Sequence, residues 1–195
     1  VQWMQQWAQR LNKVVCGSLI IAAAGEYFNR MVWAAPDGQL ITYDKRHLFR
    51  MAGEDKHFSP GQCKVVVQLD GWRICLAVCY DLRFPVWLRN NDDYDLLLVV
   101  ANWPAARLDA WQTLLRARAI ENQAFCAGLN IVGRDGAGVD YAGGSAIYAG
   151  DGAAILPPQT QPGIFSRRLQ LQTLMQMRQD FPVALDADTF SLNSQ

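Results

Sequence analysis

The stretch RICLAVCYDLRFP, from Arg73 to Pro85, decides the fold of this chain. Its residues from Ile74 to Val78 are all apolar, which is typical of a strand buried on both faces between two layers. The chain turns polar immediately afterwards, at Asp81 and Arg83. We therefore expect Cys79 at the end of a core strand, on a sharp turn that exposes its thiol at the rim of a sheet, as the serine of a nucleophile elbow is exposed.

The alternative for Cys79 is that of a small buried apolar residue, which free cysteines often are. By itself this alternative is the more frequent one. Cys75, in the middle of the same strand, is interpreted in that way. The neighbouring segments are therefore needed to choose between the two interpretations of Cys79.

The rest of the chain reads as strands on either side of one long helix. Asp70-Gly71 is a type I′ turn signal within one hairpin, and Pro36-Asp37-Gly38 is the turn signal of another. The pattern predicts a layered α/β or α+β domain. The predicted strands are Val14–Ala23, Met31–Ala35, Leu40–Tyr43, Lys64–Leu69, Trp72–Val78 and Asp95–Ala101, with strand and glycine-rich turn over Leu129–Leu156; the predicted helices are Val1–Leu11, with Trp3, Met4, Trp7 and Leu11 on one stripe, Arg107–Ala127 and Leu169–Arg178; Ser191–Gln195 is a predicted tail.

Composition bounds the classes of function. The 195 residues are 51% apolar and 18% charged, which fits a single globular domain over residues 1–195. Eighteen basic and eighteen acidic residues give no net charge, which argues against nucleic acid or an anionic membrane as partner. No apolar run is long enough to span a bilayer. Five cysteines, an odd number, argue against a disulfide framework and favour a reducing cytoplasm.

Several segments in order resemble the nitrilase superfamily of carbon–nitrogen hydrolases, and most closely its omega-amidase-like branch. The resemblance implies an αββα sandwich of two β-sheets with outer helices, no cofactor, and a homodimer in the full-length protein. It runs from near residue 10 to near residue 190. The segments that carry it are DKRHLF at Asp44–Phe49, Glu54 six residues before Pro60, CYDLRFP at Cys79–Pro85, ANWP at Ala101–Pro104, RARAIENQ at Arg116–Gln123, and Phe181-Pro182 with Asp186–Asp188.

The sequence departs from this family at one important point. The family's general base is a glutamate on an early strand, whereas the only glutamate here before Lys45 is Glu26, in a predicted turn that does not match the base motif. We therefore expect that the family's first strand, first helix and base glutamate are absent from these 195 residues. Smaller departures, Gly143–Ser145 and Ala149–Gly152, bear on active-site closure and assembly.

The resemblance implies a catalytic role for three side chains. Cys79 would attack a carboxamide and form a thioester. Lys45 would lower the pKa of that thiol and donate to the oxyanion, and the backbone N–H of Tyr80 would be the second oxyanion donor. Glu54 resembles the accessory carboxylate that orients the lysine; its alternative is that of an exposed loop acid beside Asp55.

The predicted substrate is a small carboxamide, the omega-amide of a 2-oxo dicarboxylic acid monoamide such as 2-oxoglutaramate. Its free carboxylate calls for an arginine, and Arg83 and Arg107 are the candidates, with Asn102 and Trp103 beside them. Pairing of either arginine with Asp81 or Asp109 is the structural alternative. The competing functions are an inactive remnant that only binds, or a related aliphatic amidase or N-carbamoyl hydrolase; the spacing of cysteines and histidines favours no metal site.

Overall fold

The computed structural model describes residues 1–91 and 93–192, so residues 193–195 of the predicted tail lie outside the described part. The α-helices are α1 (Gln2–Leu11), α2 (Leu108–Asn122) and α3 (Leu171–Asp180). The strands are β1 (Val15–Ala23), β2 (Glu26–Ala34), β3 (Leu40–Asp44), β4 (Val66–Leu69), β5 (Trp72–Val78), β6 (Leu96–Ala101), β7 (Phe125–Asn130), β8 (Val132–Arg134), β9 (Asp140–Ala142), β10 (Ser145–Tyr148) and β11 (Ala154–Gln159). Short 3₁₀ turns are η1 (Arg50–Ala52), η2 (Glu54–Lys56), η3 (Cys79–Arg83), η4 (Ala105–Arg107) and η5 (Val183–Asp186).

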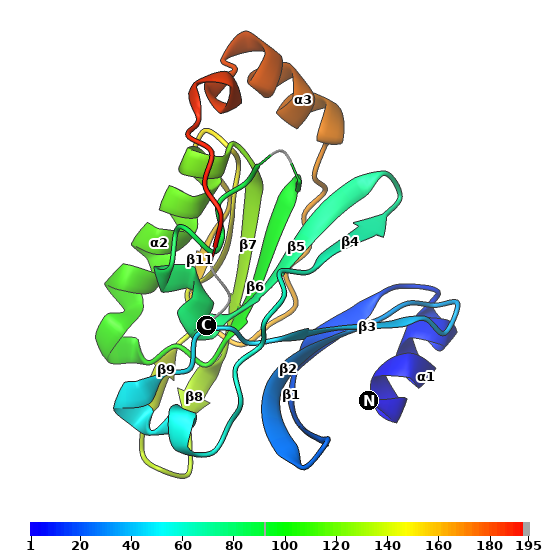
Figure 1. Cartoon of the computed structure of the whole chain (residues 1–195), viewed down its shortest axis with the longest axis vertical. Helices are drawn as coiled ribbons and strands as arrows, with labels where there is room; N and C mark the ends of the chain where they lie inside the picture. The colour runs from blue at the N-terminus through cyan, green and yellow to red at the C-terminus, as the bar shows by residue number, and fades with distance from the viewer. Residues whose placement is uncertain (92, 193–195) are drawn as a thin grey trace.

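Two sheets pack face to face between helices. The smaller sheet has the order β1-β2-β3 and the larger has the order β11-β10-β7-β6-β5-β4, while β8 and β9 form a separate ribbon. Helix α1 packs on β1 and β2, and α2 packs on β7 and β10, so the helices lie outside the two sheets (Figure 1). The predicted αββα sandwich is confirmed. No helix in the described part is long and apolar enough to cross a membrane.

Alternating residues of β2 explain how the smaller sheet joins the layers. Successive side chains of a strand point to opposite faces. Met31 and Trp33 enter the core between the sheets, whereas Val32 and Ala34 pack under α1. All four are buried, and full burial of a large apolar side chain contributes about 1.5–3 kcal/mol. Both faces of β2 therefore hold the layers together.

The parallel run β5-β6-β7 positions the functional residues. These three strands are parallel neighbours, and β5 lies one strand in from the edge strand β4. Carboxyl ends of parallel strands meet at the same edge of a sheet, where ligand sites commonly form. Cys79, Asn102 and Asn130 end β5, β6 and β7 in this way, and they face one end of the sandwich.

The hairpin turn before β5 has the predicted geometry. Asp70 and Gly71 both have positive φ, 48° and 82°, as a type I′ turn requires. The long helix, in contrast, is shorter than predicted: α2 ends at Asn122, and Gln123 adopts the left-handed conformation that closes a helix. The residues after it form β7, because pairing with β6 outweighs their helix propensity.

Two other expectations at the N-terminal side are wrong. The predicted turn that contains Glu26, over residues 24–29, is confined to Ala24 and Gly25, both with positive φ, and β2 already begins at Glu26. The predicted stripe of α1 is also shifted. Its buried residues are Met4 and Ala8, whereas Trp3 is 64% exposed. The underlying β2 presents only small and medium side chains here, so Ala8 provides the close contact.

The glycines of the C-terminal hairpin have a packing role. A Cβ atom at Gly144 would lie 2.7 Å from a methyl carbon of Leu108, and one at Gly152 would lie 2.7 Å from Ile120. Both neighbours belong to α2. Because Gly144 and Gly152 have no side chains, α2 can pack close to β10 and to the turn that follows it. The two segments that depart from the family, Gly143–Ser145 and Ala149–Gly152, therefore lie where the large sheet packs against α2.

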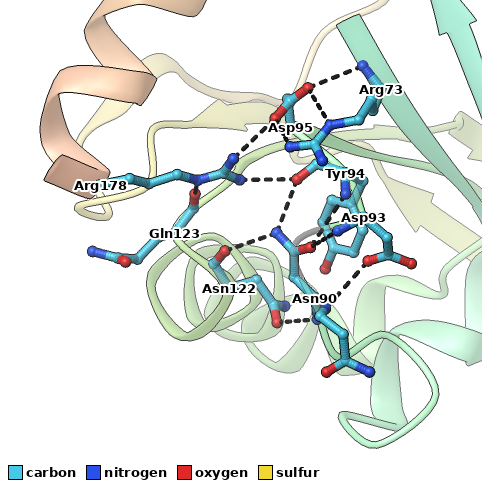
Figure 2. A network of polar contacts seen from close by, with 9 residues as sticks. Arg73, Asn90, Asp93, Tyr94, Asp95, Asn122, Gln123 and Arg178 are labelled. Atoms are coloured by element: carbon cyan, nitrogen blue, oxygen red, sulfur yellow. Dashed lines mark hydrogen bonds and ion pairs between the residues drawn. The ribbon is translucent and has the colours of Figure 1, made fainter. Parts of the chain in front are cut away.

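A polar network fixes α3 at the end of the sandwich away from Cys79 (Figure 2). Arg178 donates to Asp95 Oδ1 at 2.9 Å and to the carbonyls of Tyr94 and Gln123. Arg73 also donates to both oxygens of Asp95. Burial raises the pKa of Asp95, yet the hydrogen bonds from Arg73 and Arg178 outweigh burial and hold the pKa below its usual range. The network therefore depends on an ionised Asp95.

Candidate active site

Cys79 is the first residue after β5 and has a left-handed backbone, with φ 48°. A non-glycine residue in this region costs about 1–3 kcal/mol and persists only where the surrounding structure holds it. The N–H of Val78 donates to Asp81 Oδ2 at 3.0 Å, which closes the turn η3. The sequence prediction of a cysteine on a sharp turn at a strand end is confirmed.

Lys45 and Glu54 form a buried ion pair beside this turn. Lys45 directly follows β3, its side chain is 3% exposed, and its Nζ donates to Glu54 Oε2 at 2.5 Å. Glu54 also accepts from the N–H of Phe49 at 2.6 Å and from Asn29 Nδ2 at 3.1 Å. Glu54 is therefore no solvated loop acid. Both of its carboxylate oxygens accept hydrogen bonds, which fixes the carboxylate and thereby orients the Lys45 ammonium.

Burial dominates the electrostatics of the Cys79 thiol. Desolvation raises the pKa of Cys79 above its usual value, Lys45 lowers it, and Glu54 raises it again. Lys45 thus acts on the thiol in the expected direction, but burial outweighs its effect and the pKa of Cys79 stays raised. The thiol faces the carbonyl oxygen of Asn102, with Sγ 3.9 Å away. Attack by Cys79 on a substrate thus requires a base to remove the proton.

One cavity of about 750 Å³ collects the predicted site residues. This volume lies in the range of small-molecule sites. All eight residues selected from the sequence line it: Lys45, Glu54, Cys79, Tyr80, Arg83, Asn102, Trp103 and Arg107. They come from the ends of β3, β5 and β6 and from the turns that follow these strands.

The two arginines stack on aromatic rings of this cavity. The guanidinium carbon of Arg83 lies 5.1 Å from the Trp103 ring centre, and that of Arg107 lies 5.2 Å from the Phe49 ring centre. Within residues 1–91 and 93–192, neither arginine forms an ion pair. Pairing of Arg83 with Asp81 is wrong, because the donors around that carboxylate come from other residues.

Several cavity residues were not predicted from the sequence. Asp135 and Tyr141 come from the ribbon of β8 and β9, and the Tyr141 hydroxyl donates to Asp135 at 2.8 Å. Burial and then Asp135 raise the pKa of Tyr141. No pattern in the sequence marks this ribbon as part of the site, because only the fold brings it over β6. Asn29, which donates to Glu54, lies within β2, and no motif in the sequence marks it.

The carboxylates that line the cavity in the described part are Glu54 and Asp135. Glu26 is exposed at the tip of the β1–β2 hairpin and does not reach it. Within the same described residues, no three histidine, cysteine or acidic side chains form a group able to hold a metal ion. Besides these two carboxylates, the cavity lining includes the Cys79 thiol, the Lys45 ammonium, the His57 imidazole and the guanidinium groups of Arg83 and Arg107.

The profile of the carbon–nitrogen hydrolase family matches residues 1–179. The chain belongs to this family. Within it, the chain belongs to the omega-amidase-like branch of the nitrilase superfamily. It is 48% identical to "Omega-amidase YafV" of Yersinia enterocolitica, over 98% of this chain and 75% of that protein. It is 34% identical to the "2-oxoglutaramate amidase" of Bacillus subtilis, over 92% of this chain and 72% of that protein.

A solved structure of this carbon–nitrogen hydrolase family superimposes closely. The protein XC1258 from Xanthomonas campestris matches with a TM-score of 0.96 and 44% identity, over 98% of this chain and 76% of that one. It is described as a CN-hydrolase superfamily protein with an arsenic adduct in the active site. The family membership and the geometry together identify the chain as related to amidases.

Proposed function

We propose that the site hydrolyses the omega-amide of a 2-oxo dicarboxylic acid monoamide, such as 2-oxoglutaramate, to a carboxylate and ammonia. The observation that carries the proposal is the shared cavity of Cys79 with the Lys45–Glu54 ion pair. An amide nitrogen is a poor leaving group, and covalent attack divides its displacement into two easier steps. The relatives named omega-amidase and 2-oxoglutaramate amidase support this class of substrate.

In the proposed mechanism the thiolate of Cys79 bonds to the amide carbon. The carbonyl oxygen becomes an oxyanion, for which Lys45 Nζ and the N–H of Tyr80 are the donors. Tyr80 is the second residue of η3, and the first N–H groups of such a turn have no acceptor within it. The proton taken from the thiol passes to the amide nitrogen, which leaves as ammonia when the tetrahedral intermediate collapses to a thioester. Attack by water on the thioester releases the carboxylic acid and restores the thiol.

The arginines suggest how the substrate is oriented. A 2-oxo acid monoamide carries a carboxylate at the end opposite its amide, and a guanidinium group binds a carboxylate with two parallel hydrogen bonds. Arg83 and Arg107 line the same cavity as Cys79, each stacked on a ring. Asn102 contributes its backbone carbonyl near the thiol, and Trp103 forms part of the wall.

The proposed mechanism also requires a base that removes the proton of the Cys79 thiol. Glu54 is held by three donors, and Asp135 accepts from the N–H groups of Ala137 and Val139 and from Tyr141. The hydrogen bond of the Cys79 thiol goes to the carbonyl of Asn102 and to neither carboxylate. General acid–base assistance contributes about 10²–10⁴ in rate. We therefore infer that the 195 residues alone hydrolyse the amide slowly or not at all.

Ammonia release from 2-oxoglutaramate tests the proposal, with Cys79→Ala as the matched inactive control. Turnover that exceeds that of the control supports hydrolysis. The competing aliphatic amidase and N-carbamoyl hydrolase are separated by offering a simple aliphatic amide and an N-carbamoyl amino acid. Binding of 2-oxoglutaramate by calorimetry without turnover favours the binding remnant. Absence of both binding and turnover refutes the substrate class.

Three further statements belong to this proposal. Residues 1–195 act as one domain, because a single core cluster includes side chains of both sheets and of α2. The protein works in a reducing compartment such as the cytoplasm, since its five cysteines are free. Its partner is a small amide, and the protein forms a homodimer, which sedimentation analysis would test.

A further inference from the structure

Asp81 is a fully buried carboxylate two residues after the proposed nucleophile, and it does not line the cavity. Its Oδ1 accepts from the backbone N–H of His47 and from His47 Nδ1, both at 2.9 Å. Its Oδ2 accepts from the Tyr43 hydroxyl at 2.7 Å and from the N–H of Val78 at 3.0 Å. Because it is absent from the cavity wall, Asp81 does not contact a substrate.

The donors around Asp81 come from two different parts of the site. Val78 ends β5, directly before Cys79. Tyr43 and His47 are placed two residues before and two residues after Lys45. The carboxylate thus joins the turn that presents the thiol to the segment that presents the ammonium. No residue of this group was assigned a function from the sequence.

The donors are themselves held in place. Trp87 Nε1 donates to the Tyr43 hydroxyl at 3.1 Å, and the His47 ring stacks on Phe84 with ring centres 3.7 Å apart. A buried carboxylate is tolerated only where donors satisfy it, and hydrogen bonds to a charged group are stronger than neutral ones. The group around Asp81 therefore has one preferred arrangement.

The hydrogen bonds of Asp81 are needed because Cys79 has an unfavourable backbone conformation. Its φ of 48° must be maintained by neighbouring interactions. The side chain of Lys45 bonds to Glu54, and the hydrogen bond of the Cys79 thiol goes to Asn102. The distance between thiol and ammonium is thus set by the backbone that carries them.

We propose that Asp81 is a positioning residue that fixes the turn of Cys79 against the segment of Lys45 through its hydrogen bonds to Val78, Tyr43 and His47. The proposal rests on the proposed amide hydrolysis for its purpose. The position of Asp81 affects the reactivity of the Cys79 thiol, which can be measured whether or not the chain turns over an amide.

The first experiment compares Tyr43→Phe with Tyr94→Phe. Both tyrosines are fully buried, and the Tyr94 hydroxyl donates to the carbonyl of Leu88 at 2.6 Å, away from the cavity. Alkylation by limiting iodoacetamide is followed by mass spectrometry at Cys79, with the exposed Cys63 as internal reference. Tyr43→Phe should slow alkylation of Cys79 about tenfold, as a one-unit rise in its pKa would, because Lys45 moves away and Asp81 loses a donor.

Tyr94→Phe is expected to lower the melting temperature similarly without changing the ratio of the two alkylation rates. Equal ratios in both variants would overturn the proposal, since a merely structural role predicts that result. This measurement does not need turnover. It therefore separates failure of the positioning proposal from failure of the proposed function.

The second experiment compares Asp81→Asn with Asp95→Asn, the other buried carboxylate with several donors (Figure 2). An asparagine has one acceptor oxygen, so at position 81 a backbone N–H, of Val78 or of His47, loses its acceptor. Where the unaltered protein releases ammonia, kcat should fall about 100-fold with an unchanged KM, as expected for a misplaced reacting group. Asp95→Asn should leave kcat unchanged; an equal loss in both variants would refute the proposal.

Discussion

Replacement of Glu54 by glutamine should destabilise the protein far more than an ordinary charge removal. The Lys45 side chain is 3% exposed, and its ammonium bonds to Glu54 at 2.5 Å. Removing one partner of a buried ion pair costs about 3–5 kcal/mol, because the other charge remains buried without compensation. For a chain of this size each kcal/mol lowers Tm by about 2–4 °C, so the expected decrease is about 6–20 °C.

The neighbouring pair Arg30–Asp44 supplies the control. Its side chains are 20% and 22% exposed, so water screens the charge that Asp44→Asn leaves on Arg30, and this change should cost less than Glu54→Gln. Thermal unfolding followed by circular dichroism gives both values. The double variant Lys45→Met with Glu54→Gln should recover part of the loss, because no buried charge then remains. Equal Tm values for Glu54→Gln and Asp44→Asn would refute this reasoning.

Three further outcomes are expected. Since burial raises the pKa of Cys79, its alkylation rate should be low at pH 7 and should still rise above pH 8.5 as thiolate forms; a plateau below pH 8 would contradict this. Arg107→Met should raise KM for 2-oxoglutaramate at least about tenfold, since a charge-assisted contact contributes about 1.5–3 kcal/mol, and should leave KM for an aliphatic amide unchanged; parallel changes would exclude a carboxylate contact. Gly128→Ala should cost about 1–3 kcal/mol in urea unfolding, because its Cβ would lie 2.4 Å from a methyl carbon of Leu115, whereas Gly17→Ala, with open space around it, should not; equal effects would contradict the packing argument.

Local patterns predicted the elements that a turn dipeptide or a hydrophobic run marks by itself. The hairpin around Asp70-Gly71 and the apolar strands β5 and β6 needed only turn chemistry and hydrophobic runs. The end of α2 could not be found in this way. Residues 123–127 continue a helical composition, and only pairing with β6, more than twenty residues earlier in the chain, makes them a strand.

Site residues that stand in a chemical motif could be predicted from the sequence. Site residues that are brought in only by the fold could not. Cys79 and Lys45 stand in recognisable segments, and the fold places both in one cavity. Asp81 stands in the same CYDLRFP segment as Cys79, but its hydrogen bonds to Tyr43 and His47 appear only in the structure, and Asn29 and Tyr141 have no signature of their own. The positions of Asn29 and Tyr141 follow from the register of β2 and from the β8–β9 ribbon, whose residues line the cavity. A residue whose role is to orient another residue is therefore the kind that the sequence does not reveal.

The electrostatics of the cavity favour one role of Lys45 over the other. A cation beside a thiol can lower the pKa of that thiol or can donate to an oxyanion. Here Glu54 neutralises most of the charge of Lys45 at close range, and burial of Cys79 outweighs what remains. A hydrogen-bond donor keeps its direction in such a pair, while its net field is reduced. In the proposed hydrolysis Lys45 is thus better suited to the oxyanion than to the thiolate, and removal of the proton from Cys79 would fall to a separate base.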